Sequence, residues 1–190
     1  MPALEIKYRN FPSALGEMIG GATSRGVCFL EWHDRGGVAK ILERVGKRYK
    51  MPLVPGSNQH LDQLERELSE YFQGERKIFG VIIDVIGTSF EMSVWRRLLE
   101  ISYGETRSYG QIAHELGKPG ASRAVGHANG ANYLSIVIPC HRVIEANGNL
   151  RGYGGKLWRK KYLLELEKGL SPKVRRLPDS RAQTMSDFDR

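Results

Sequence analysis

Apolar and polar positions along the first 86 residues change in short segments that predict a mixed α/β region. Branched and aromatic residues bounded by glycines or polar turn residues predict strands at residues 4–8 and 26–32. In residues 60–72 the apolar positions recur every three or four residues with charges opposite them, which predicts an amphipathic helix. Residues 78–86 are strand-like again. We therefore predict a small α/β domain over residues 1–86.

Two capping boxes predict helix starts after this region. Thr88 is followed three residues later by Glu91, and Ser108 is followed in the same way by Gln111. In a capping box the first side chain accepts from the backbone three residues on, and the acidic or amide side chain binds back. A helix is therefore predicted from each, and the second is short because a Gly-Lys-Pro-Gly stretch ends it.

The rest of the chain predicts a mainly α domain over residues 87–169. Small residues fill a predicted helix at 121–131, and an apolar period returns in a helix at 157–168. The apolar run 134–139 predicts a strand or a buried extended segment. Residues 170–190 are polar, hold two prolines and have no apolar period, so we predict a disordered tail.

The two short helices on either side of the Gly-Lys-Pro-Gly stretch predict a helix–turn–helix. The second carries mostly small side chains, which would let its backbone lie deep in a groove of DNA. Arg123 lies within its first turn, positioned to reach phosphates or bases. The absence of an Asn or Gln beside Arg123 favours shape recognition, in the minor or the major groove. A closely packed helix pair with a surface arginine fits the same pattern.

Charge is unevenly distributed along the chain. The net charge is +8, yet residues 1–91 hold 12 basic and 12 acidic residues, whereas residues 92–169 hold 12 basic and 6 acidic. This asymmetry fits a polyanion such as nucleic acid, and equally a basic protein without such a partner. No run reaches the roughly 20 apolar residues of a membrane span, no secretory signal begins the chain, and two distant cysteines make no disulfide framework. We expect a cytoplasmic protein with no membrane partner.

Cys140 follows the apolar run directly after Pro139, where regular strand pairing has to stop. A structural zinc site needs four ligands, and no second cysteine or histidine pair with that spacing is near. The neighbouring His141 and Arg142 would lower the pKa of the thiol and favour a reactive thiolate, activated by a base that a third group orients. In an extended segment neighbours point apart, so the chain has to turn or a water has to mediate. A reactive thiol and a buried core cysteine both remain open, whereas Cys28 reads as a core thiol.

Several motifs together resemble one family. "IPCHRVI", preceded by "SRAVGHANGAN" and followed by "GYGG" and "LLELE", resembles the O6-alkylguanine-DNA alkyltransferases, also called methylated-DNA–protein-cysteine methyltransferases. "GTSFEMSVW" and "YGETRSYGQIA" are similar to the C-terminal domain of that family, and "GATSRGVCFLEW" to the N-terminal domain of its bacterial members. The resemblance covers roughly residues 15–169.

The resemblance implies a chemistry for four residues. Cys140 would accept the alkyl group from guanine O6 and keep it as a thioether, so one molecule repairs one lesion. His141 would relay the thiol proton through water, and Glu167 would orient that histidine. Tyr109 would donate to N3 of the departing guanine. The damaged base would be extruded from the duplex to reach the thiol.

The resemblance also implies residues that bind DNA and form the pocket. Arg123 would fill the space of the extruded base, and Asn132 would form the hinge after the recognition helix. The remaining implied DNA contacts are Ser122, Ala124, Gly126 and Tyr109, and the remaining pocket residues are Val143, Tyr153 and Gly154. Two positions depart from the family pattern, because Tyr133 stands where proline is frequent and Lys156 where a third glycine is usual. These departures leave the chemistry intact and bear on the breadth of the pocket.

The function expected from the resemblance is stoichiometric repair of O6-alkylguanine, and also of O4-alkylthymine, in double-stranded DNA by a monomer without metal or cofactor. The alternatives are a non-catalytic lesion binder, a helix–turn–helix regulator and a Cys–His hydrolase. A lesion binder would lack the cysteine, and a regulator would need a sensing domain that residues 1–86 do not resemble. A hydrolase would turn over many times.

Overall fold

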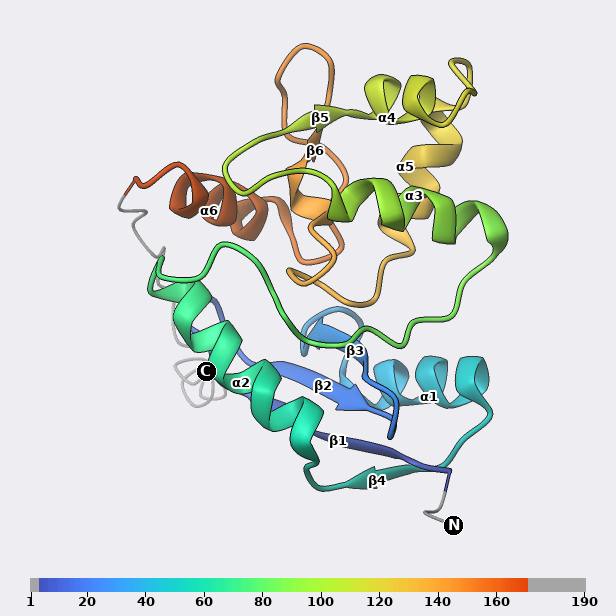
Figure 1. Ribbon diagram of the computed structural model, residues 1–190, viewed down its shortest axis with the longest axis vertical. Coiled ribbons are helices and arrows are strands. Elements are labelled where there is room, and N and C mark those ends of the chain that lie inside the picture. Colours follow the sequence, from blue (N-terminus) through green and yellow to red (C-terminus); the bar gives the residue numbers. More distant parts are fainter. Residues whose placement is uncertain (1–3, 171–190) are drawn as a thin grey trace, which may run out of the picture.

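The computed structural model describes residues 4–170 and has a sheet region at its N-terminal side and a helical region at its C-terminal side (Figure 1). The sheet has the order β3-β2-β1-β4, in which β1, β2 and β3 are antiparallel neighbours and β4 runs parallel to β1. Helix α2 crosses one face of this sheet (Figure 1). The elements of this region are β1 (Ile6–Phe11), β2 (Met18–Ala22), β3 (Val27–Trp32), α1 (Val38–Tyr49), β4 (Leu53–Pro55) and α2 (Gln59–Phe72).

The C-terminal region confirms the helices predicted from the sequence. Its elements are α3 (Ser89–Leu99), β5 (Arg107–Ser108), α4 (Tyr109–Glu115), α5 (Ser122–Gly130), the 3-10 helix η1 (Cys140–Arg142), β6 (Val143–Ile144) and α6 (Leu157–Glu167). Strands β5 and β6 pair in parallel, which joins the start of α4 to the exit of η1. Helix α5 packs against both α3 and α4.

Both predicted capping boxes are formed. Thr88 Oγ1 accepts from the backbone of Glu91 at 3.2 Å, and the carboxylate accepts from Thr88 N at 2.8 Å. Ser108 Oγ accepts from the backbone of Gln111 at 3.1 Å, and Gln111 Oε1 accepts from Ser108 N at 2.7 Å. Each box satisfies two backbone donors that a helix start leaves open.

The prediction of a strand at residues 78–86 is wrong. Only a bridge to Val27 forms, through Val27 N to Ile82 O and Asp84 N to Val27 O, both 2.8 Å. Tyrosine hydroxyls bind the backbone beyond it, since Tyr49 donates to Asp84 O at 2.6 Å and Tyr133 accepts from Ile86 N at 2.7 Å. Tyrosine side chains, rather than a neighbouring strand, therefore bind the backbone of Asp84 and Ile86.

The apolar run 134–139 is a buried segment without a regular strand. Leu30 and Leu134 form one isolated bridge, and Ile136 turns the chain with a φ of 72°. These contacts seat the segment on β3, because Leu30 N donates to Tyr133 O at 2.9 Å and Ser135 N donates to Leu30 O at 2.9 Å. The core is consequently continuous between the sheet and the helical region.

Two further expectations concern the C-terminal tail and membrane-spanning segments. The predicted disordered tail, residues 170–190, falls outside the described residues from residue 171 on. Among residues 4–170, no helix has the length and apolar content that crossing a membrane requires.

Candidate active site at the Cys140 turn

The chain turns at Cys140. After Pro139, η1 is closed by hydrogen bonds from Cys140 N to Ile138 O at 2.8 Å and from Arg142 N to Pro139 O at 3.0 Å. Cys140 is 5% exposed and His141 is fully buried. A 3-10 turn removes the extended geometry in which adjacent side chains must point to opposite sides. Cys140 and His141 therefore need not point to opposite sides of the chain, as they would in an extended segment.

The Glu167 carboxylate is the centre of a buried hydrogen-bond network. His141 Nε2 lies 2.7 Å from Oε1, and Arg142 binds both oxygens, with Nε at 2.8 Å and Nη2 at 3.0 Å. Tyr71, from α2 in the N-terminal region, donates to Oε1 at 2.7 Å. Gly104 N donates to Oε2 at 3.2 Å. A buried carboxylate is tolerated when its lone pairs are filled in this way.

These contacts define the protonation of the pair. Burial alone would raise the pKa of Glu167, but the hydrogen bonds from His141 and Arg142 and the charge of Arg142 hold that pKa well below its usual range. Burial lowers the pKa of His141, against the opposing effect of Glu167, so the ring is neutral at pH 7. Because the carboxylate only accepts, Nε2 carries the proton. Nδ1 is buried, has no partner among the described residues, and is free to accept a proton.

Cys140 lies among groups that oppose the effect of burial. Burial raises the pKa of its thiol, while the Asn132 side chain and the cations Arg35 and Lys160 act to lower it. Asn132 itself is 1% exposed and is fixed by hydrogen bonds to Ile138 O and from Leu134 N, both 3.0 Å. The predicted hinge residue thus connects the end of α5 to the segment that leads into η1.

The Tyr109 hydroxyl binds the loop between β6 and α6, residues 145–156, which we call the pocket loop. The Tyr109 hydroxyl donates to Arg151 O at 3.0 Å, and the Lys160 ammonium donates to the same oxygen at 2.8 Å. Lys160 also donates to Val143 O at 2.5 Å. Lys160 therefore joins the exit of η1 to the loop before Tyr153, although its side chain is fully buried.

The other predicted pocket residues lie on this loop. The Tyr153 hydroxyl is buried and has no partner among residues 4–170. The backbone at Gly154 comes so close to a guanidinium that an added Cβ would lie 2.5 Å from Arg35 Cζ. Lys156 has a φ of 72°, a conformation that favours glycine, and its Nζ lies 2.9 Å from Asp34 Oδ2.

The four DNA contacts predicted on α5 are exposed or partly exposed. Arg123 and Ala124 are exposed, and Ser122 and Gly126 are partly exposed. Gly126 faces Tyr109, since an added Cβ would lie 3.8 Å from its ring. Tyr109 therefore lies between the exposed face of α5 and the loop at residue 151.

Three residues of this site, Tyr71, Lys160 and Arg35, had no role in the expectations from the sequence, and Arg142, which was expected to lower the pKa of the thiol, binds Glu167 instead. Tyr71 and Arg142 hold Glu167, and Lys160 and Arg35 are cations around Cys140. A signal for Lys160 was present, because it shares one face of α6 with the buried residues Leu163, Leu164 and Glu167 at helical spacing. No local signal points to Tyr71 or Arg35, whose partners are far away in the sequence. Within residues 4–170, no cluster of three or more His, Cys, Asp or Glu is arranged to hold a metal ion.

Comparison with known proteins places this arrangement in a family. A family model described as "6-O-methylguanine DNA methyltransferase, DNA binding domain" matches residues 89–169. The methylated-DNA–protein-cysteine methyltransferase of Mycobacterium leprae is 49% identical over 135 residues, which cover 70% of this chain and 82% of that protein. The inducible one of Bacillus subtilis is 40% identical over 153 residues, covering 80% and 85%.

Mycobacterium tuberculosis supplies a relative and a solved structure. Its methylated-DNA–protein-cysteine methyltransferase is 58% identical over 106 residues, so the match spans 64% of that relative's length and 56% of this chain. The crystal structure of M. tuberculosis OGT in complex with DNA superimposes with a TM-score of 0.74 at 42% identity, covering 86% of this chain and 93% of that one. Sequence and fold agree, and the chain belongs to the methylated-DNA–protein-cysteine methyltransferase family.

Proposed function

We propose that this chain repairs O6-alkylguanine in double-stranded DNA by transferring the alkyl group to its own Cys140. The observation that carries the proposal is the buried arrangement in which Cys140 and His141 share one turn and His141 is bound to Glu167 at 2.7 Å. In the transfer a bond forms between Sγ and the alkyl carbon while the bond from that carbon to O6 breaks. The thioether is stable, so each molecule reacts once.

The imidazole and the acid supply the base that the thiol needs. The thiol proton passes by way of a water to His141 Nδ1, the nitrogen that has no protein partner among the described residues. Glu167 holds Nε2–H and stabilises the imidazolium that forms. The electron pair of the broken bond stays on guanine, and Tyr109 donates a proton to N3 so that the base leaves neutral. The thiol proton balances the proton given to the base.

Access to the thiol requires extrusion of the damaged base, and we assign this to α4 and α5 as a helix–turn–helix. The connection between them is a tight turn, with Lys118 N donating to Ala113 O at 2.9 Å and Ala121 N donating to Lys118 O at 2.8 Å. Arg123 on the exposed face of α5 fills the space of the extruded base. Ser122, Ala124 and Gly126 let the helix approach the DNA backbone closely.

The extruded base enters a pocket formed by Asn132, Val143, Tyr153 and Gly154. The ion pair between Lys156 and Asp34 holds the start of α6 beside this loop. O4-alkylthymine, which presents an alkyl group on a similar exocyclic oxygen, is a second substrate of the same pocket. Residues 1–86 and 87–169 act as two domains, of which the second carries the reaction and the DNA contacts.

An intact-mass measurement tests the proposal. The protein is mixed with a duplex carrying O6-methylguanine, and the expected result is one added methyl on Cys140 with an end point of one lesion per protein molecule. An unchanged mass contradicts the proposal and favours a lesion binder. Repeated turnover would favour a hydrolase. A parallel duplex with O4-methylthymine tests the second substrate, and rising salt should weaken DNA binding steeply.

A further inference from the structure

Arg35, in the N-terminal region, binds the hinge segment of the C-terminal region, residues 130–134. It follows β3, and its guanidinium donates through Nη1 to Asn132 O at 2.7 Å and through Nη2 to Gly130 O at 2.6 Å. Gly130 is the last residue of α5, where helix carbonyls have no partner within the helix. A cation at this end is also favoured by the helix dipole. One side chain therefore binds both the end of α5 and the hinge.

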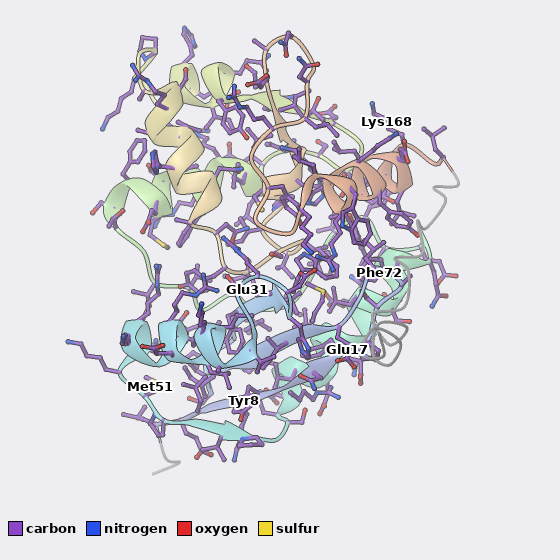
Figure 2. All side chains as sticks on the ribbon, turned by 180° about the vertical axis from the view of Figure 1, so that it is seen from behind. Tyr8, Glu17, Glu31, Met51, Phe72 and Lys168 are labelled. Atoms are coloured by element: carbon purple, nitrogen blue, oxygen red, sulfur yellow. The ribbon has the colours of Figure 1, made fainter. Side chains whose placement is uncertain are left out.

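Glu31 holds Arg35 in this position. Its side chain is 2% exposed, Oε1 accepts from Arg35 Nη1 at 3.1 Å, and Oε2 accepts from Arg44 Nη2 at 2.5 Å. Figure 2 shows Glu31 where β3 meets the C-terminal region. Burying a carboxylate is costly unless it is paired, so this pairing restrains the planar fork of Arg35 to one orientation.

The same guanidinium lies against the pocket loop. A Cβ added at Gly154 would lie 2.5 Å from both Cζ and Nε of Arg35, which shows how close the loop backbone comes. Arg35 is also one of the cations that act on the Cys140 thiol. It thus contacts the end of α5, the hinge and the pocket loop at once.

Tyr133 also fastens the hinge. Its hydroxyl lies 3.2 Å from the Tyr49 hydroxyl of α1 and accepts from Ile86 N at 2.7 Å. Its ring packs edge-on against Trp95, with centroids 5.7 Å apart. Residues 130–134 are therefore held by Arg35, by Tyr49 and by the backbone of Ile86, all in the N-terminal region, and Tyr133 makes contacts that a proline could not.

We infer that Arg35 is a positioning residue for alkyl transfer, which fixes the hinge segment 130–134 so that α5 and the Cys140 turn keep the spacing that the reaction needs. This inference rests on the proposed function. Arg35 does not contact the reacting atoms. Its loss should misplace the extruded base relative to the thiol, and misplacement by about 1 Å is enough to slow an oriented reaction strongly.

The test compares Arg35→Ala with Arg44→Ala in single-turnover transfer from an O6-methylguanine duplex. Both variants lose one positive charge and one contact to Glu31, but only Arg35 binds the hinge carbonyls. At saturating DNA we expect Arg35→Ala to react about tenfold more slowly, with its half-saturating DNA concentration changed by less than about twofold. Arg44→Ala should react like the wild type. Arg35→Lys should recover part of the rate, because it keeps the charge but loses the fork.

Hydrogen exchange without DNA separates this inference from the proposed function. The backbone amides of residues 131–138 should exchange faster in Arg35→Ala than in Arg44→Ala or the wild type, while those of β2 and β3 stay protected. If β2 and β3 also lose protection, the variant has lost its fold and Arg35→Lys is compared instead. Equal transfer rates and equal exchange in the Arg35 and Arg44 variants would overturn the inference. A wild type that transfers no methyl would refute the proposed function, and the exchange measurement would still decide whether Arg35 holds the hinge.

Discussion

Two cysteines lie in the described part of the chain, and both are buried, Cys28 with 0% and Cys140 with 5% of its surface exposed. Cys28 lies near the start of β3, where burial raises the pKa of its thiol and the nearby Asp84 raises it further. Cys140 begins a 3-10 turn, where burial also raises the thiol pKa but Asn132, Arg35 and Lys160 act against it.

The comparison shows that burial does not separate a core thiol from the thiol that we propose as the alkyl acceptor. The two thiols differ instead in the sign of the charges near them and in the local backbone. A regular strand surrounds Cys28 with apolar neighbours, whereas the turn at Cys140 has a base, His141, at the next position, and Glu167 of α6 binds that base.

Replacing each cysteine in turn should give an all-or-none contrast. Cys140→Ala should abolish methyl transfer from an O6-methylguanine duplex while lesion binding is retained, because the substitution removes the acceptor atom without disturbing the DNA-binding face. Cys28→Ala should transfer one methyl at the wild-type rate. Intact mass and a DNA-binding assay measure the two outcomes, and any loss of transfer in a folded Cys28→Ala variant would break the comparison.

Removing the acid behind the histidine should slow transfer by about 100-fold. Glu167→Gln leaves Arg142 buried without its charged partner and allows the amide to favour the wrong imidazole tautomer. It should also lower the free energy of unfolding by about 3–5 kcal/mol, the usual cost of breaking a buried ion pair. Single-turnover kinetics and urea unfolding measure the two effects.

The matched control and the pH dependence sharpen this prediction. Glu165→Gln, two residues earlier on α6 and paired with Lys161 at 3.7 Å, should change neither quantity appreciably. Because the folded pKa of Glu167 is depressed, its contribution is present above the unfolded pKa of about 4.3 and is lost as pH falls below it. The stability gap between wild type and Glu167→Gln should therefore shrink in acid.

Arg123→Ala should slow transfer by about tenfold without loss of fold, because the extruded base would no longer be replaced in the duplex. This would show that Cys140 depends on delivery of the base as well as on its own surroundings. Single-turnover kinetics and thermal unfolding measure the effect. Arg66→Ala on α2 removes the same charge from the N-terminal region and should leave the rate unchanged, so a common loss in both variants would argue for a general charge effect.

Lys160→Met should reduce the reactivity of the Cys140 thiol by about threefold at pH 7.5, because a cation that lowers the thiol pKa is lost. Alkylation by iodoacetamide in a Cys28→Ser background measures it. Burial lowers the pKa of Lys160 to about 8, so the wild-type cation is itself lost as pH rises through that value and the two proteins should converge in alkali. Lys161→Met, at the neighbouring exposed position, is the control, and equal reactivity of all three proteins would contradict the role of Lys160.

Tyr71→Phe should give the smallest effect, a loss of about 1 kcal/mol in stability and about threefold in transfer rate. It removes one of the hydrogen bonds to Glu167 and leaves the ion pairs in place. Tyr103→Phe is the control, since that hydroxyl lies 3.5 Å from Leu166 O and does not bind the carboxylate. Thermal unfolding and single-turnover kinetics would contradict the prediction if both phenylalanine variants behaved alike.

Elements with local signals were predictable, and elements without them were missed. The capping boxes gave the starts of α3 and α4 to the residue. In β2 the glycines hide the strand pattern, because the rings of Phe11 and Phe29 fill the space where side chains at Gly20 and Gly21 would lie. Helix α1 begins after Gly37 without a side-chain cap, so no sequence signal marks its start.

Local patterns in the sequence predicted the helices of the C-terminal region and the place of Cys140 beyond a proline, and the family motifs implied roles for the residues around it. These features depend on hydrogen bonds and residue spacing within a few positions. Only the tertiary structure brought Tyr71 to Glu167, 96 residues away, and Arg35 to Asn132, 97 residues away. The two members of each pair are separated by several helices and strands. Whether they come into contact therefore depends on how the whole core packs and not on local spacing.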